Sequence, residues 1–432
     1  MPCLDIIGGF PINISVQTDL MNRIEVLSQQ LAPAASQAPL SRKLPSDVVI
    51  CCAVRSAMGK AKRGGFAKLS PEDLLAPILK ELLVRSKANP SAIGDIQIGN
   101  VLQAGSGMIS GRMAALMAGI PDSVPLMSIN RQCSSGLQAC ANIAAAISAG
   151  HIDCGIGGGV ESMSLFDMMA SLDITKVSES VFNHEGARDC LIPMGLTSEN
   201  VAEKFKISRE DQDRMAVDSH ARATRAQENG WFDSEIVPIT VTDPVSGKKK
   251  VINRDEGIRK ETTMESLGSL PPSFKKGGTT TAGNSSQLTD GAAGVLLARR
   301  SFAEANKLPI IGKFVSFAAV GCPPEIMGIG PAVAIPAALK KANLTIDDID
   351  VFEINEAFAS QATYCINKLG ISRDKVNVCG SGLSLGHPLG CTGARQMATL
   401  FPILKRTGKK RGVVSMCIGA GMGAAAVFES EQ

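Results

Sequence analysis

The sequence is poor in aromatic residues and in histidine, with one Trp, one Tyr and four His among 432 residues. None of its 12 cysteines belongs to a C-x-x-C pair. That absence excludes the disulfide framework of a small secreted protein and indicates a reducing compartment. No apolar run approaches the ~20 residues that a membrane-spanning helix needs, which predicts a soluble protein. A net charge of +3 argues against a nucleic acid or an anionic membrane as the partner.

Small residues are abundant instead. The sequence has 43 glycines, and 44% of its residues are hydrophobic against 20% charged. This composition is typical of a globular α/β enzyme with tight turns and close packing. The chain is long enough for two or three domains, whose cores need neither disulfides nor metal ions.

The amino-terminal residues 1–45 differ in composition from the rest. "LAPAASQAPLSRKLPS" is a linker rich in Pro, Ala and Ser, and the segment before it has an apolar stripe at helical spacing, at Leu20, Ile24, Leu27 and Leu31. Residues 1–22 contain two acids and no Lys or Arg, against the basic pattern of a mitochondrial presequence. We predict a targeting and linker segment here, with a solvated helix in a tail as the alternative, and a fold that starts near Asp47.

Two stretches of the remaining chain resemble each other. "IGDIQIGNV" begins at Ile93 and "IDDIDVFEI" at Ile346, a separation of 253 residues (346 − 93). Cys133 and His387 are 254 residues apart (387 − 133), and each precedes a small-residue turn and an apolar helix. The near-constant offset predicts a duplicated, layered α/β architecture.

The pattern changes between the two similar stretches. Residues 162–286 begin with a helical pattern and continue with polar turns, which indicates an inserted loop domain, the usual place for a substrate lid. We predict that residues 46–161 and 287–308 form the first half and that residues 309–432 form the second half.

Cys133 stands in "INRQCSSGLQACANIAAAI", between an extended run and a helix. The helix has an inward stripe that includes Cys140, which is therefore expected in the core. We expect Cys133 at the amino terminus of the helix, where free amide hydrogens and the helix dipole favour a thiolate and lower its pKa. Taken alone, a cysteine is more often a buried core residue, so the assignment of Cys133 depends on its partners.

Only one of the four histidines lies in a pattern typical of a catalytic residue. His387 stands in "LSLGHPLGCTGARQ", where Gly386 removes steric cover and Pro388 keeps the histidine extended. It is the candidate base for a cysteine. The others lie among polar residues and are predicted to be surface or cap residues, namely His151, His184 and His220.

A metal site formed by His387, Cys391 and Cys379 is not expected. Pro388 and Gly390 break the helical face that the four-residue spacing of His387 and Cys391 would need.

A second candidate sulfur is Cys417 in "SMCIGAGMGAA". A dinucleotide-binding turn would need a following helix, whereas "AAAVFE" predicts a closing strand. We therefore expect a strand, a tight glycine turn and a strand, in which the glycines let backbone amides approach a substrate oxygen.

Together these residues resemble the thiolase family over residues 46–432. "NRQCSSGLQA", "FEINEAFASQ", "GHPLGCTGARQ" and "SMCIGAGMGAA" occur in the order and spacing of that family. The resemblance implies two βαβαβαββ halves stacked as αβαβα layers with an inserted loop domain. It also implies CoA-dependent cleavage of a 3-oxoacyl-CoA to acetyl-CoA and a shortened acyl-CoA, in fatty-acid β-oxidation in the peroxisomal matrix.

The resemblance assigns a role to each residue of the predicted site. Cys133 would be the nucleophile that carries the acyl group, His387 the base that activates it, and Cys417 the acid and base for the second substrate. The amides of Cys133 and Gly419 would hold one oxyanion. His387 would hold the second together with a water bound by Asn355.

Substrate and partner contacts follow from the same resemblance. CoA would be a substrate rather than a permanently bound cofactor, and would contact Met194, Arg259 and Ser286. No metal is implied, and a homodimer is. Residues 23–31, "RIEVLSQQL", resemble the amino-terminal peroxisomal targeting nonapeptide and would bind the import receptor.

One departure from the family concerns the histidine segment. Ser381 and Ser384 stand where the family usually has glycine and alanine, and Ser384 is close enough in sequence to alter the hydrogen bonding of His387.

Three other functions compete with this hypothesis. They are an acetoacetyl-CoA thiolase, a non-catalytic binding protein with the thiolase fold, and an acyl-carrier-protein condensing enzyme. The last uses His or Asn partners where this sequence has Cys417, which favours the thiolase.

Overall fold

The computed structural model describes residues 42–168, 174–242 and 246–432. The targeting nonapeptide predicted at residues 23–31 lies outside the described residues. In the described parts of the chain, no helix combines the length and apolarity needed to cross a membrane. Nor do those parts bring together three or more His, Cys, Asp or Glu residues as a metal site would require.

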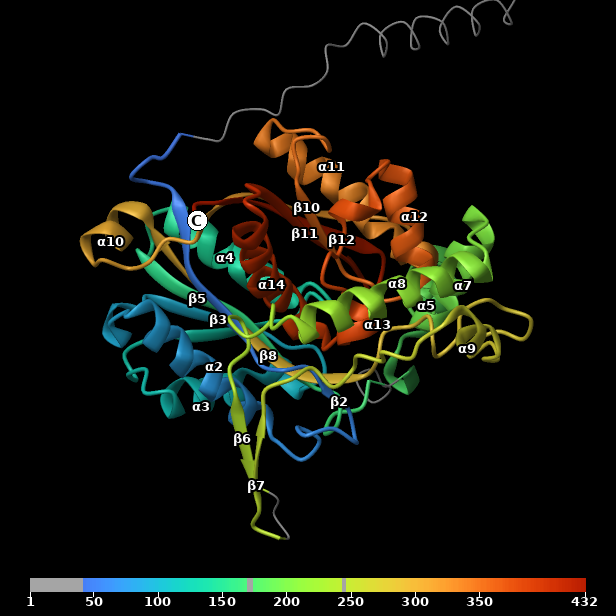
Figure 1. Cartoon of the computed structure of the whole chain (residues 1–432), viewed down its shortest axis with the longest axis horizontal. Coiled ribbons are helices and arrows are strands. Elements are labelled where there is room, and N and C mark those ends of the chain that lie inside the picture. The colour runs from blue at the N-terminus through green and yellow to red at the C-terminus, as the bar shows by residue number, and fades with distance from the viewer. Residues whose placement is uncertain (1–41, 169–173, 243–245) are drawn as a thin grey trace, which may run out of the picture. The chain divides into compact units, whose positions relative to one another are not determined.

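One mixed β-sheet runs through the described residues, with the strand order β10-β11-β12-β9-β1-β8-β5-β3-β4 (Figure 1). The strands are β1 (Val48–Arg55), β3 (Asp95–Gly99), β4 (Leu126–Ile129), β5 (Cys154–Ser162), β8 (Thr289–Arg299), β9 (Gly312–Gly321), β10 (Val351–Ile354), β11 (Arg411–Ile418) and β12 (Met422–Ser430), and the short β2 (Gly59–Lys60) pairs with β8. The antiparallel pair β1–β9 joins two sub-sheets, with Ile50 opposite Gly312.

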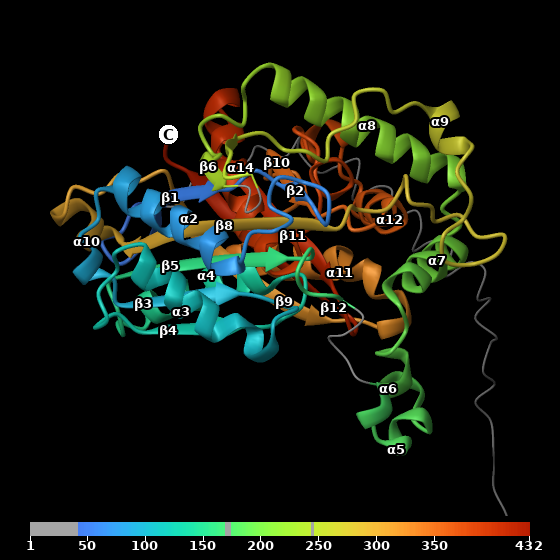
Figure 2. The same ribbon diagram turned by 90° about the horizontal axis from the view of Figure 1, so that it is seen from below.

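Helices cover these sub-sheets in three layers (Figures 1 and 2). The central layer holds α4 (Ser135–Ser148) and α14 (Thr392–Thr407), which pack on each other. α4 packs on strands of the first sub-sheet, and α14 packs on strands of both. The outer layers hold α2 (Pro71–Ser86) and α3 (Met108–Met117) beside the first sub-sheet, and α11 (Gly330–Ala342) with α12 (Ala359–Leu369) beside the second. Ten consecutive residues of α14, 392–401, are buried, as a helix covered on all sides requires. The predicted αβαβα order is confirmed.

The second half repeats the element order of the first. β10 begins 256 residues after β3 (351 − 95), α14 begins 257 residues after α4 (392 − 135), and β11 begins 257 residues after β5 (411 − 154). The predicted duplication is confirmed, with an offset slightly larger than the one read from the sequence.

Glycine lets the two central helices touch at their amino termini. A Cβ atom on Gly136 would lie 2.7 Å from the carbonyl oxygen of Gly390, and one on Gly393 would lie 2.4 Å from the amide nitrogen of Leu137. Side chains cannot approach backbone atoms so closely, so larger residues would push the helices apart. The turns that precede α4 and α14 therefore lie side by side.

The remaining elements lie mostly between β5 and β8 in the sequence. They are α5 (Glu179–Phe182), α6 (Glu185–Asp189), α7 (Met194–Phe205), α8 (Arg209–Glu228), α9 (Met264–Gly268) and the hairpin β6 (Ile239–Thr242) with β7 (Lys249–Ile252), followed after β8 by α10 (Arg300–Ala305). The long α8 starts with a capping box of Ser208 and Asp211. It packs on α12 and on the short α13 (Gly382–Leu385), so the predicted loop-domain stretch lies against the segment that leads to His387.

Candidate active site

Cys133 lies in a tight turn between β4 and α4. Gln132 has a positive φ of 47°, and the hydroxyl of Ser135 accepts from the amide of Arg131 at 2.9 Å while donating to the carbonyl of Gln132 at 2.6 Å. This turn places Cys133 directly before the capping residue Ser134. The predicted position at the amino terminus of a helix is confirmed, and Cys140 lies in the core as expected.

The sulfur of Cys133 is held by backbone amides in a dry environment. Only 9% of the residue is exposed. Burial raises the pKa of the thiol to about 11, although hydrogen bonds from the amides of Gly419 and of Cys133 itself lower it. The prediction that the helix end lowers this pKa is therefore wrong, because the cost of desolvating a thiolate exceeds the effect of the amides.

The imidazole of His387 is 5% exposed and is fixed through one nitrogen. Its Nδ1 lies 2.6 Å from the hydroxyl oxygen of Thr392 and 3.3 Å from the side-chain amide of Asn355. Nε2 is buried and has no hydrogen-bond partner among the described residues. Burial, with a contribution from the charge of Arg395, lowers the pKa of His387 to about 3. The imidazole is therefore neutral near pH 7.

The hydroxyl of Thr392 lets His387 adopt either tautomer. Thr392 donates to Nδ1 when Nε2 carries the proton, and accepts when Nδ1 carries it. In one tautomer Nε2 accepts a proton from a thiol, and in the other it donates to a substrate oxygen. Both roles predicted for His387 are thus compatible with one position of the ring.

Cys417 lies on β11 and is completely buried, beside Met327 and Ala357. Burial raises the pKa of its thiol well above the usual value, and the Cys133 thiol contributes in the same direction. The two sulfurs are thus close enough to interact electrostatically. A thiol that keeps its proton is suited to act as an acid.

The predicted glycine turn joins β11 to β12 at residues 419–421. Ala420 and Gly421 have φ values of 60° and 85°, which close the turn within three residues. The strand–turn–strand prediction is confirmed. The turn points the amide of Gly419 at the sulfur of Cys133, so both amides of the predicted oxyanion hole converge there.

Asn355 follows β10 and is completely buried. Its Oδ1 has no hydrogen-bond partner among the residues that the structure describes, which supports the prediction that it holds a water. The next residue, Glu356, accepts from the hydroxyl of Ser219 at 2.6 Å and from the side-chain amide of Asn377 at 2.8 Å. Glu356 thus anchors the loop that holds Asn355.

The three predicted CoA contacts occupy different surroundings. Met194 begins α7 and packs against the cluster that contains Cys417. Ser286 is half-buried, and its amide donates to the carbonyl of Ala357 at 2.9 Å. Arg259 is exposed. Met194 and Ser286 thus lie beside the thiol site, while Arg259 is exposed to solvent.

The prediction that His220 is a surface residue is wrong. His220 is 3% exposed, because it lies on the face of α8 that also buries Ala216 and Ala223. Its Nδ1 accepts from the amide of Arg259 at 3.1 Å. Burial, with smaller effects of Arg259 and Lys60, lowers its pKa to about 4.

The other two histidines behave as predicted. His184 caps α6 by accepting from the amide of Ala187 at 3.2 Å, and His151 is exposed.

The two serines that depart from the family pattern do not bond to His387. The hydroxyl of Ser384 lies 2.9 Å from that of Ser219, and the hydroxyl of Ser381 lies 3.3 Å from Nη2 of Arg395. The expectation that Ser384 alters the hydrogen bonding of His387 is wrong, since Thr392 and Asn355 make those contacts.

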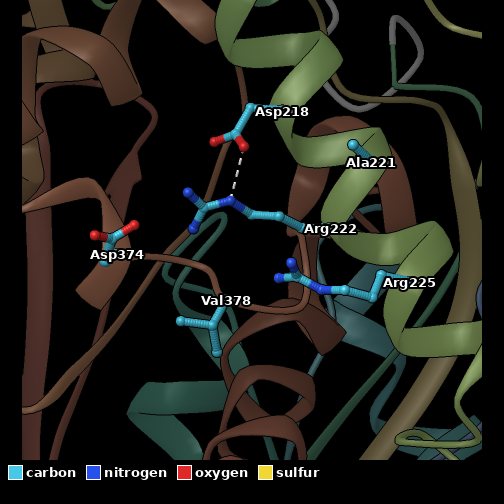
Figure 3. Close-up of a pocket in the computed structure, with 6 residues that line it drawn as sticks. All are labelled: Asp218, Ala221, Arg222, Arg225, Asp374 and Val378. Atoms are coloured by element: carbon cyan, nitrogen blue, oxygen red, sulfur yellow. Dashed lines mark hydrogen bonds and ion pairs between the residues drawn. The ribbon is translucent and has the colours of Figure 1, made fainter.

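An open cavity of about 230 Å³ lies along α8, and neither Cys133 nor Cys417 lines it (Figure 3). Two of its charged lining residues are paired, because Asp218 bonds to Arg222 and to Arg373, and Arg222 also donates to the carbonyl of Val376. These bonds fix α8 to the segment that leads to His387, and the other two charged residues of the lining are Arg225 and Asp374.

Sequence reasoning missed two residues that contact the site. One is Thr392, which bonds to His387. The other is Glu161 in "GGGVESMS", a completely buried acid at the end of a glycine-rich strand. A charged residue at that position was the available signal.

A buried thiol at a helix start, a neutral imidazole and a second buried thiol are the groups that an acyltransferase with a cysteine nucleophile would use. Residues 48–301 match the family described as "Thiolase, N-terminal domain", and residues 308–430 match "Thiolase, C-terminal domain". The chain belongs to the thiolase family.

Several relatives match nearly the whole chain. The peroxisomal 3-ketoacyl-CoA thiolase of Homo sapiens is 56% identical over 404 residues, which are 93% of this chain and 94% of that protein. Peroxisomal 3-ketoacyl-CoA thiolase A of Rattus norvegicus is 54% identical over 427 residues, 96% of this chain and 98% of that one. The solved structure of the dimeric peroxisomal thiolase of Saccharomyces cerevisiae has a TM-score of 0.85 at 50% identity, covering 90% of this chain and 99% of the yeast chain.

Proposed function

We propose that this chain cleaves 3-oxoacyl-CoA with CoA to give acetyl-CoA and a shortened acyl-CoA, as a peroxisomal enzyme of fatty-acid β-oxidation. It is an acetyl-CoA C-acyltransferase like its relatives. The observation that carries the proposal is the convergence of the Cys417 thiol and the amide of Gly419 on the sulfur of Cys133.

In the first half-reaction, Nε2 of His387 takes the proton of the Cys133 thiol, and the thiolate attacks the 3-keto carbon. The amides of Cys133 and Gly419 stabilise the resulting oxyanion. The bond between C2 and C3 then breaks, and the thiol of Cys417 protonates the acetyl-CoA enolate. The acyl group remains on Cys133 as a thioester.

In the second half-reaction, the Cys417 thiolate takes the proton of the incoming CoA thiol. The CoA sulfur attacks the acyl-thioester and releases the shortened acyl-CoA. Cys133 regains its proton from the imidazolium of His387, which restores the starting state. The high pKa values of both thiols fit this scheme, because charge then exists only while the substrate is present.

The stretch 162–286 is assigned to the CoA and substrate lid, between halves formed by residues 46–161 with 287–308 and by residues 309–432. Met194 and Ser286 lie beside the thiol site, and the exposed Arg259 is available to a phosphate of CoA.

We assign the chain to a homodimer in the peroxisomal matrix, imported through residues 23–31. The yeast relative is described as dimeric. In this chain, α3 and the edge strand β4 expose an apolar surface. Its residues are Met108, Ile109, Met113, Leu116 and Met117 of α3 and Met127 of β4. A second copy would bury these side chains.

The test is CoA-dependent loss of 3-ketohexadecanoyl-CoA compared with loss of acetoacetyl-CoA. Faster cleavage of the long substrate supports the proposal. Activity on acetoacetyl-CoA alone indicates the acetoacetyl-CoA thiolase, and binding without cleavage of either substrate indicates the non-catalytic protein.

A further inference from the structure

Glu161 is a completely buried acid near the end of β5 that the reaction scheme above does not use. Its carboxylate accepts four hydrogen bonds from neutral amides. Oε1 accepts from the side chain of Asn100 at 3.2 Å and from the backbone of Leu102 at 3.1 Å. Oε2 accepts from the backbone of Val101 at 3.0 Å and of Gly390 at 2.9 Å.

These donors surround the nucleophile from both halves of the chain. Val101 and Leu102 pack in one apolar cluster with Cys133, and the same cluster contains Leu389. Gly390 follows Leu389 in the turn that begins at His387. One carboxylate therefore bonds to a loop of the first half and to the histidine turn of the second half.

The packing around Gly390 leaves little room for another arrangement. A Cβ atom on Gly159 would lie 2.0 Å from the carbonyl oxygen of Gly390, and one on Gly390 would lie 2.8 Å from Cα of Asn100. The histidine turn is thus inserted between two strand ends of the first half. If the turn lost its bond to Glu161, a buried amide would be left without a partner.

Burial raises the pKa of Glu161 to about 7, although the amides of Gly390, Leu102 and Val101 lower it. Above that pH its carboxylate is charged and also acts on the site. It raises the pKa of Cys133 and of Cys391 after the larger effect of burial. Arg395 and Arg55 oppose it at Cys391, and Arg395 also acts on His387. Cys133 also interacts electrostatically with the thiol of Cys417.

We propose that Glu161 is a positioning residue of the thiol site, which fixes the His387 turn against the Cys133 turn and presents a negative charge to the Cys133 sulfur. The positioning part rests on the proposed function. The electrostatic part does not, because it concerns the reactivity of a thiol toward any reagent.

The experiment compares Glu161→Gln with a matched variant, Glu199→Gln. Glu199 is also a buried acid that accepts from backbone amides, those of Thr279 and Thr280, but it acts on neither thiol. Alkylation at Cys133 is followed well above pH 7, where the carboxylate of Glu161 is charged. Mass spectrometry of the Cys133 peptide measures the rates with neutral iodoacetamide and with anionic iodoacetate. The ratio of the two rates reports local charge and is insensitive to general loosening, which accelerates both reagents.

For Glu161→Gln we expect kcat to fall about tenfold or more, with KM changed less than threefold, because a small misplacement of a base is costly. The ratio of the iodoacetate rate to the iodoacetamide rate should rise about threefold, as repulsion of the anion is removed. Glu199→Gln should leave this ratio at the parental value. An unchanged ratio in Glu161→Gln, or an equal rise in both variants, overturns the electrostatic part.

Glu161→Asp separates positioning from charge and serves if the Gln variant does not fold. It keeps the charge but is one methylene too short to reach both loops, so kcat should fall while the alkylation ratio stays parental. Parental kcat in Glu161→Asp overturns the positioning part. If the parental chain itself shows no turnover, the proposed function fails, and the alkylation ratio still decides the electrostatic part.

Discussion

The turns that precede α4 and α14 occupy equivalent places in the two halves but hold their reactive groups differently. Cys133 lies two residues before the first residue of α4, whereas His387 lies five residues before the first residue of α14. Backbone amides contact the sulfur. The side chains of Thr392 and Asn355 contact the imidazole.

The difference suits the chemistry that each group performs. A backbone amide can only donate, so it stabilises negative charge on the sulfur or on an attached oxyanion. A hydroxyl can donate or accept, so Thr392 can keep its hydrogen bond to His387 while the imidazole gains and loses a proton. The longer histidine turn, residues 388–391, also reaches across to Glu161 in the first half through the amide of Gly390.

The largest effect on turnover is expected when either reactive sulfur is removed. Cys133→Ala should abolish acylation and lower turnover at least ~10⁴-fold, because no other group takes the acyl chain. Cys417→Ala should still form the acyl-enzyme but lower turnover by about 10²–10⁴-fold, because the enolate and CoA lose their proton carrier. Trapping of the acyl-enzyme by mass spectrometry distinguishes the two.

Cys140→Ala is the matched control, since it removes a core sulfur from α4. It should keep kcat within twofold and destabilise the fold by about 1–2 kcal/mol. Robust turnover by Cys133→Ala or Cys417→Ala would contradict the site assignment.

The contact between Thr392 and His387 is the next largest test. Thr392→Val keeps the shape but removes the hydroxyl at Nδ1, and kcat should fall about 10–100-fold because the tautomer is no longer controlled. The pH profile of kcat measures the effect. Thr399→Val makes the same change in the same helix at a hydroxyl that bonds to Glu235, and should lower stability rather than kcat. Equal losses of kcat in both variants would assign Thr392 to the scaffold.

Local patterns predicted the layers, the helix start at Cys133 and the glycine turn after Cys417, because each depends on periodicity or on residues close in sequence. Burial was harder to predict. The helix end was expected to lower the pKa of Cys133, but the second half covers the sulfur, and desolvation raises it. His220 and Glu161 were missed for the same reason, since both are buried by segments distant in sequence.

His220 is buried like His387 but lies outside the thiol site. It therefore shows what burial alone does to the pKa of a histidine and to stability. His220 has a pKa of about 4 against 6.5 in an exposed site, so its contribution to stability is present above pH 6.5 and is lost as the pH falls to 4. His220→Asn keeps an acceptor for the amide of Arg259 but cannot titrate. Between pH 6.5 and pH 4, the free energy of unfolding of His220→Asn should fall by about 3 kcal/mol less than that of the parental chain.

The measurement is denaturant unfolding at several pH values, with His184→Asn as the exposed control. His184→Asn should retain the parental pH dependence. The same dependence in His220→Asn would show that burial of this imidazole does not govern acid stability. Turnover at pH 7 should change little in either variant, in contrast to a change at His387.

The smallest effect is expected for Ser384→Ala. Ser384 lies three residues before His387, yet its hydroxyl bonds to Ser219 and to the carbonyl of Ser381. Its loss should cost about 1 kcal/mol of stability and leave kcat and its pH profile within twofold. Ser219 keeps its bond to Glu356, which limits the damage. A shifted pH profile of kcat in Ser384→Ala would mean that the position of His387 depends on contacts with α8 as well as on Thr392 and Asn355. The turn before α14 would then depend on more distant contacts than the turn before α4.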